Sequence, residues 1–152
     1  MLQVLRVSVT DHLMTGDRFA VVHDGAGFSR TDKIAAIMKN SLACKTLKVC
    51  WAGADQSENC GYCEKCVRTQ LNFSAAGAKS SPPCFPSELD VNDIRRIQIN
   101  NKYQLAELAS ILAYAREHGV SAPWMPVLQD RLTTWQPVDP GVLERQVNGG
   151  VR

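Results

Sequence analysis

The sequence CWAGADQSENCGYCEKC, at residues 50–66, holds four of the six cysteines in this 152-residue chain. Their spacing is Cys50-x9-Cys60-x2-Cys63-x2-Cys66. Two-residue gaps bring successive sulfur atoms into one small volume, and a fourth thiol returning from a polar loop can complete a tetrahedron around Zn²⁺. The pattern therefore predicts a four-cysteine metal site.

The fourth ligand is expected to be Cys50, because residues 53–59 are small or polar and can loop back to the other three cysteines. Gly61 relieves crowding where backbone amides turn toward sulfur. Of the remaining cysteines, Cys44 is expected to end a helix and Cys84 lies in a proline-stiffened segment. Both fit better as small apolar fillers, although neither is excluded as a ligand.

Two other uses of the cysteines compete with zinc. Disulfides require an oxidising compartment, but residues 1–9 alternate polar and apolar side chains and lack the apolar core of a secretory signal. We therefore expect reduced thiols in a cytoplasmic protein. An iron–sulfur cluster is the other alternative, because C-x2-C-x2-C also begins a ferredoxin motif, yet the chain continues with Val67 rather than toward a fourth Cys followed by Pro. Zinc is favoured.

Four thiolates would fill every coordination position of the metal. Because no position would remain for an activated water, the zinc is predicted to be structural. The same four thiolates leave a net charge of about −2 on the cluster. Basic residues near it in sequence can offset that charge, namely Lys45, Lys48, Lys65 and Arg68.

Charge and composition exclude some other classes. The net charge is +2, and the basic residues are interleaved with acidic ones, so nucleic acid is a possible partner but not a favoured one. The sequence contains no apolar run near eighteen residues, and we predict no membrane span.

We predict an α+β fold that is mainly helical, with short strands and a four-cysteine zinc knuckle. Strands are expected at Leu2–Val9, Phe19–His23 and Leu47–Trp51. The predicted divisions are a strand and helix segment with the zinc site at 1–78, a Ser/Pro linker at 79–86, a helical segment at 87–136 and a loose tail at 137–152, together one compact unit.

The helix predictions rest on capping signals and 3.6-residue periodicity. Ser29 has the form of an N-cap with Asp32 as the acidic third helical residue. Further helices are expected from Cys66 to near Gly77, from about Gln104 to His118, and from Pro126 to Trp135. The helix from Gln104 has an apolar face that needs a partner, formed by Leu105, Leu108, Ile111, Leu112 and Ala115.

Three short motifs follow one another in the order found in a known protein family. The helix start Ser29-Arg30-Thr31-Asp32-Lys33-Ile34 precedes Val49-Cys50-Trp51, which precedes Cys60-Gly61-x-Cys63-x2-Cys66-x-Arg68. Over roughly residues 22–74 this order resembles the C-terminal part of the 7-cyano-7-deazaguanine synthase family and related PP-loop ATP-dependent enzymes. The resemblance implies that Cys50, Cys60, Cys63 and Cys66 hold structural zinc. The family's lysine at the helix start corresponds to Arg30 or, with a one-residue insertion, to Lys33.

Enzymes of this kind bind ATP through an N-terminal Ser-Gly-Gly-x-Asp-Ser loop, and no such run occurs in this sequence. The resemblance thus implies a portion that is inactive alone and is completed by a separate nucleotide-binding half or by a homodimer. In either case we expect that no other part of the chain covers the Leu2–Val9 strand or the apolar face of the Gln104 helix.

The turn at Gly25–Ser29 most simply reverses the chain before a capped helix. The matching segment of the family contacts substrate, however, so we predict a cleft there whose substrate-binding residues are Asp24, Ser29, Arg30 and Lys33. No residue is assigned a catalytic role.

Three functions compete: the zinc-bearing part of a PP-loop-type nucleotide enzyme, which is favoured; a zinc-knuckle module that binds protein or RNA; and an iron–sulfur protein. The second has a partial hint in the basic and aromatic residues near the knuckle, which are Lys48, Trp51, Tyr62, Lys65 and Arg68.

Overall fold

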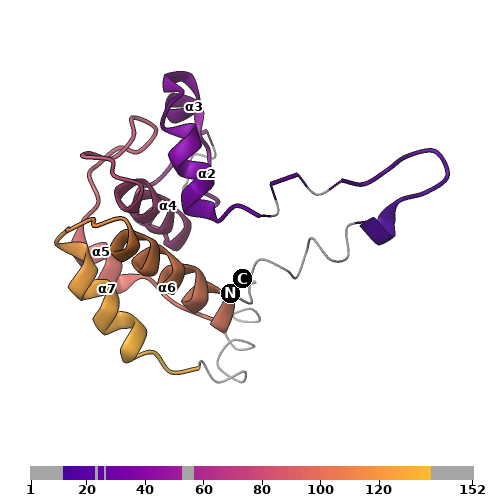
Figure 1. Ribbon diagram of the computed structural model, residues 1–152. Helices are drawn as coiled ribbons and strands as arrows, with labels where there is room; N and C mark the ends of the chain where they lie inside the picture. Colours follow the sequence, from indigo (N-terminus) through magenta and orange to yellow (C-terminus); the bar gives the residue numbers. More distant parts are fainter. Residues whose placement is uncertain (1–11, 23, 26, 53–56, 138–152) are drawn as a thin grey trace, which may run out of the picture.

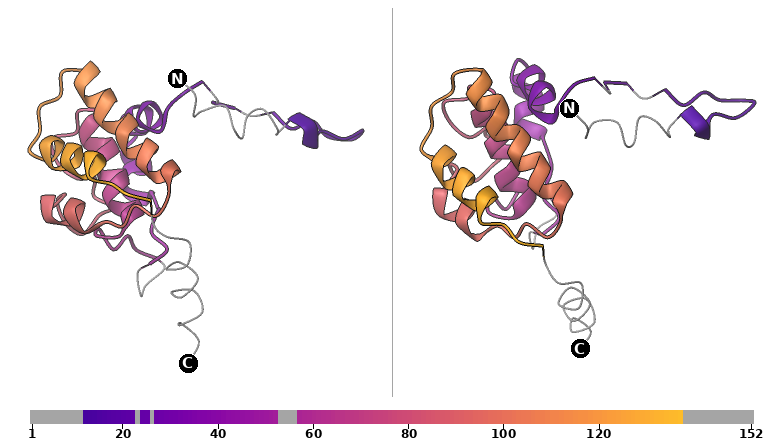
Figure 2. Two further views of the ribbon diagram at one scale, coloured as in Figure 1. Left: turned by 90° about the horizontal axis from the view of Figure 1, so that it is seen from below. Right: turned by 60° about the horizontal axis from the view of Figure 1, so that its bottom comes forward.

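The computed structural model describes residues 12–22, 24–25, 27–52 and 57–137. The elements in chain order are the 3-10 turn η1 (His12–Met14) and the helices α2 (Arg30–Ile37), α3 (Ser41–Thr46), α4 (Glu64–Ala75), α5 (Val91–Arg96), α6 (Lys102–Glu117) and α7 (Trp124–Thr133). The helices gather into one body, and residues 12–22 extend from it as an arm (Figures 1 and 2). The prediction of a mainly helical chain is confirmed.

The main apolar core lies among α4, α5, α6 and α7. α4 contributes Val67, Leu71 and Ala75, and α6 contributes the side chains that face them. Trp124 is 3% exposed, and its indole N–H donates to Ser74 Oγ over 2.8 Å, which joins the start of α7 to α4. Burial of these side chains is the main stabilising contribution to this part of the chain.

The apolar face of α6 was expected to need a partner outside the chain, and that prediction is wrong. Leu108, Ile111, Leu112 and Ala115 are at most 2% exposed, and Leu105 packs against the same core. α4 and α7 both pack against α6 and cover this face. The other half of the prediction, the Leu2–Val9 strand, lies outside the described residues.

Two predicted strands are not formed. Among the described residues the only ladder pairing is an isolated antiparallel bridge between Gly16 and Phe19. Ala20–Val22 have no strand structure, Leu47–Cys50 have no regular structure and Trp51 lies in a bend. The physical reason in the second case is a side chain that replaces a strand partner: Asn59 bonds the backbone of residues 47, 49 and 50.

The predicted helix start at Ser29 is confirmed. Ser29 Oγ accepts from the Asp32 backbone N–H over 3.1 Å, and Asp32 Oδ2 accepts from the Ser29 backbone N–H over 2.8 Å. This reciprocal pair is a capping box, which satisfies two backbone donors at the helix start. α2 packs against α4, and the buried Thr31 hydroxyl donates to Asn72 Oδ1 over 2.7 Å.

The other predicted helices form with small shifts in their bounds. α4 begins at Glu64, two residues before the predicted Cys66, and α6 begins at Lys102 because Asn101 accepts from the backbone N–H groups of Tyr103 and Gln104. α6 stops at Gly119, whose φ of +67° ends the helix as predicted. None of the helices in the described ranges is long and apolar enough to cross a membrane.

The Ser/Pro segment at 79–86 lies against the helical body at several points. Ser81 Oγ donates to Gln70 Oε1 over 2.8 Å, and Pro82 and Phe85 are buried. Of the tail predicted at 137–152, the structure describes residue 137, and residues 138–152 lie outside the described ranges.

Candidate metal centre

The side chains of Cys50, Cys60, Cys63 and Cys66 converge, with all four Sγ atoms within 4.8 Å of one another. Two of the sulfur pairs are 3.8 Å (Cys50 to Cys63) and 3.9 Å (Cys60 to Cys66) apart. A tetrahedron with Zn–S bonds of about 2.3 Å has sulfur–sulfur edges of about 3.8 Å, so the cluster has the size that zinc requires. Cys44 and Cys84 are not members of this group. The chain therefore has a four-cysteine site that could hold a metal ion.

The turn from Cys60 to Cys63 positions two ligands. The Cys63 backbone N–H donates to Cys60 Sγ over 3.4 Å, as expected where amides turn toward sulfur. Gly61 has φ of +85°, and a Cβ there would lie 3.3 Å from both Pro86 Cγ and Ser87 Oγ. The Gly61 carbonyl accepts from Gln70 Nε2 over 2.7 Å, which fastens the turn to α4. Glycine is needed here both for its backbone conformation and for the close approach of residues 86–87.

A buried amide that the sequence reasoning missed holds the site together. Asn59 Oδ1 accepts from the backbone N–H groups of Val49 (2.9 Å) and Cys50 (3.1 Å). Its Nδ2 donates to the carbonyls of Leu47 (2.8 Å) and Cys84 (3.0 Å). One side chain thus joins the segment that carries Cys50 to the loop that carries Cys84 and to its own neighbour, the ligand Cys60. Its position beside Cys60 was the only signal in the sequence.

The sulfur atoms are withdrawn from solvent to different degrees. Cys66 and Cys50 are buried, whereas Cys60 and Cys63 are partly exposed. Burial raises the pKa of the Cys66 thiol, and the neighbouring Cys63 and Cys60 thiols raise it further. Burial also raises the pKa of Cys63. Four thiolates crowded this closely would need a cation, and a metal ion such as zinc, which displaces thiol protons, could supply that charge.

The charged side chains near the cluster have other contacts. Arg68 Nε lies 3.2 Å from Glu64 Oε1, and Arg68 Nη1 lies 3.8 Å from Glu107 Oε2. Lys65 Nζ lies over the ring of Trp51, and Lys48 Nζ donates to the Glu58 carbonyl. The charge of Arg68 is therefore neutralised by carboxylates. Of the four basic residues that were expected to offset the negative charge of the cluster, Lys65 lies nearest in sequence to one of the four cysteines.

Of the four predicted substrate-binding residues, two have contacts within the chain and two are exposed. Ser29 is used as the helix cap, and Arg30 Nε pairs with Glu107 Oε2 over 2.6 Å. Asp24 and Lys33 are exposed. Three hollows of the described surface are lined by other residues. A substrate contact by Asp24, Ser29, Arg30 and Lys33 stays a prediction.

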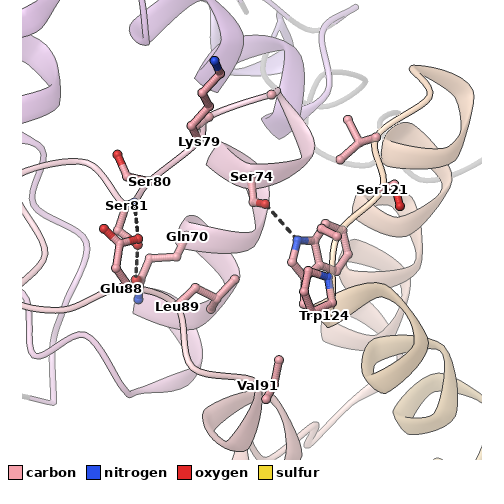
Figure 3. Close-up of a pocket in the computed structure, with 15 residues that line it drawn as sticks. Gln70, Ser74, Lys79, Ser80, Ser81, Glu88, Leu89, Val91, Ser121 and Trp124 are labelled. Carbon is pink, nitrogen blue, oxygen red and sulfur yellow. Dashed lines mark hydrogen bonds between the residues drawn. The ribbon is translucent and has the colours of Figure 1, made fainter.

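The first hollow lies between the end of α4 and the start of α7 and has a volume of about 460 Å³ (Figure 3). Trp124 forms one wall, and the pair of Gln70 and Ser81 lies on the opposite side. Glu88 Oε2 accepts from the Ser81 backbone N–H over 2.7 Å. These polar groups hold the 79–89 segment against α4, so the hollow is explained by how that segment is fastened.

No protein-family model matches this chain, and neither a curated protein nor a solved structure matches it. The function must therefore be argued from the metal site and the surfaces around it.

Proposed function

We propose that this chain is the structural-zinc-bearing C-terminal portion of a PP-loop nucleotide enzyme similar to the 7-cyano-7-deazaguanine synthases, and that it is inactive alone. The observation that carries the proposal is the convergence of four sulfur atoms at the spacing of a zinc tetrahedron. With all four positions on the metal filled by sulfur, zinc would act by folding the chain rather than by activating water.

The elements that carry the motif order also support this proposal, because they pack together. α2, which begins at the capping box, lies against α4, which begins at the metal ligands. Arg30 at the start of α2 and Arg68 on α4 share the carboxylate of Glu107 on α6. The two helices of the resembling segment that carry the motif order, α2 and α4, are thus packed together beside the four-cysteine cluster.

The arm at residues 12–22 supports the portion of the proposal that concerns a larger enzyme. Leu13, Met14, Phe19 and Val22 are each more than 60% exposed. The arm lies away from the helical body (Figures 1 and 2), and the backbone hydrogen bonds between Gly16 and Phe19 lie within it. A cluster of exposed large apolar side chains marks a surface that another domain covers. The nucleotide-binding half is the expected cover.

The proposal is tested in two steps. Metal analysis of the purified chain is expected to give one zinc per chain and no iron; a brown protein with cluster absorbance would instead establish the iron–sulfur alternative. Next, the coding sequence around this chain is read for a Ser-Gly-Gly-x-Asp-Ser loop, and a PP-loop segment found there is co-expressed with the chain. We expect the two to co-purify and to turn over ATP, with the chain alone inactive. Metal-dependent ATP turnover by the pure chain, or failure of the two to associate, would reject the proposal.

A further inference from the structure

The residues next to two of the ligands place large aromatic side chains in solvent. Trp51 follows Cys50 and is 80% exposed, and Tyr62 precedes Cys63 and is 62% exposed. The Cys50 and Cys63 sulfur atoms are 3.8 Å apart, so Trp51 and Tyr62 are attached to the chain beside the same cysteine cluster. Neither ring belongs to the apolar clusters of the described residues. Their exposure therefore has no explanation in the packing of the chain.

Each ring has a basic side chain beside it. Lys65 Nζ lies over the Trp51 ring, which is a cation–π contact. Tyr62 lines a hollow of about 800 Å³ together with Arg96, whose side chain is 77% exposed. This surface thus combines flat aromatic faces with long cationic side chains. Proteins use this combination to stack the bases and contact the phosphates of single-stranded nucleic acids.

The hollow beside Tyr62 adds groups that can pair with base edges. Gln98 and Asn100 line it, and each carries an amide with both donors and an acceptor. Its two carboxylates are already paired, Glu64 with Arg68 over 3.2 Å and Asp93 with Arg96 over 3.9 Å. Pairing lowers the repulsion that these acids would exert on a phosphate.

We propose that Trp51 and Tyr62 form a stacking platform for single-stranded nucleic acid, with Lys65 and Arg96 as its phosphate contacts. The net charge of +2 argues against a duplex, which needs an extended basic surface. Stacking on a π-face is insensitive to net charge, and two cations suit a strand of a few nucleotides. The platform is independent of the PP-loop proposal, because it uses the zinc site only as a scaffold.

The experiment measures binding of the zinc-loaded chain to fluorescein-labelled 12-mers of oligouridylate and oligodeoxythymidylate, with a 12-base-pair duplex alongside, by fluorescence anisotropy. We expect the single strands to bind more tightly than the duplex, and the two 12-mers to reveal any preference for ribose. The Trp51→Ala/Tyr62→Ala double variant is expected to lose at least about tenfold in affinity, whereas Trp51→Phe keeps most of it.

The matched control is Tyr103→Ala, since Tyr103 is also exposed and has Lys102 over its ring at 5.8 Å, but lies on α6. Zinc content is measured for every variant, so that a damaged metal site is recognised. An equal loss in the Tyr103 variant, or no binding of single strands by the unmodified chain, would overturn the proposal and leave the patch as a protein-docking surface.

Discussion

The helical core and the cysteine cluster are neighbouring regions held by different forces. The core contains twelve buried apolar residues from α4 to α7 and the segments between them. Among the described residues, the cluster buries only Cys50, Cys66 and Phe85. α4 belongs to both, since Cys66 lies in its first turn and Leu71 in its middle. α4 therefore lies against the cysteine cluster at its start and against the helical core beyond its first turn.

The largest expected effect is loss of the metal. Cys63→Ser removes one of four thiolates, and structural zinc contributes roughly 10 kcal/mol or more to folding in small sites. We expect amides at 47–52 and 57–66 to lose protection from hydrogen exchange, while α6 and α7 remain protected. Cys44→Ser is the control, because Cys44 lies outside the cluster. Unchanged exchange in the Cys63 variant would show that the two regions do not differ in this way.

The reverse case is a cavity in the core. Leu108 is completely buried, and Leu108→Ala is expected to lower the free energy of unfolding by about 2–5 kcal/mol. Urea denaturation measures this, and zinc content should stay at that of the unmodified chain. Leu42→Ala, at an exposed position on α3, should change stability little. Loss of zinc from the Leu108 variant in its native state would mean that the core and the cluster are one cooperative unit.

The amide of Asn59 should matter for the cluster alone. Asn59→Ala removes four hydrogen bonds from its side chain to the backbone of Leu47, Val49, Cys50 and Cys84. By analogy with outer-shell partners of metal ligands, we expect zinc affinity to fall about 10–100-fold in a chelator competition. Asn59→Asp keeps the acceptor but loses the donors, and is expected to weaken binding too. Asn92→Ala, at an exposed site, is the control; equal affinities would contradict this role.

The sequence allowed features to be predicted where their partners are local. Ser29 and Asp32 are three residues apart, and Cys60, Cys63 and Cys66 are separated by two-residue gaps. Asn59 could not be recognised, because it bonds Leu47 and Cys84, at 12 and 25 residues' distance. The strand at 47–51 failed for the same reason: its extended residues find a side chain instead of a sheet. α3 and α5 are six residues each, too short to show helical periodicity.

A smaller loss of stability is expected from replacing either of two glycines with alanine. The two positions separate the steric cost of an added Cβ from the cost of a positive φ. Gly61 and Gly119 both have positive φ, but a Cβ meets Pro86 and Ser87 at Gly61 and nothing within 4 Å at Gly119. Gly119→Ala should cost about 1–2 kcal/mol through its backbone alone. Gly61→Ala should cost more in unfolding experiments and should also weaken zinc binding, since Gly61 lies between two ligands. Equal costs with unchanged zinc affinity would show that residues 86–87 yield freely.

The smallest expected effect concerns α2, which packs against α4. Ser29→Ala removes the side-chain acceptor of the capping box, and loss of an N-cap costs about 1 kcal/mol. Ser29→Asp supplies a carboxylate at the same position and should restore much of the stability, although it places a second acid beside Asp32. Because the cap satisfies backbone groups of α2 only, zinc affinity should be the same in all three proteins. Chemical denaturation and chelator competition on the same samples measure both quantities. A fall in zinc affinity for Ser29→Ala that Ser29→Asp reverses would mean that α2 transmits strain through Thr31 and Asn72 to the start of α4, and the two regions would then share more than one helix.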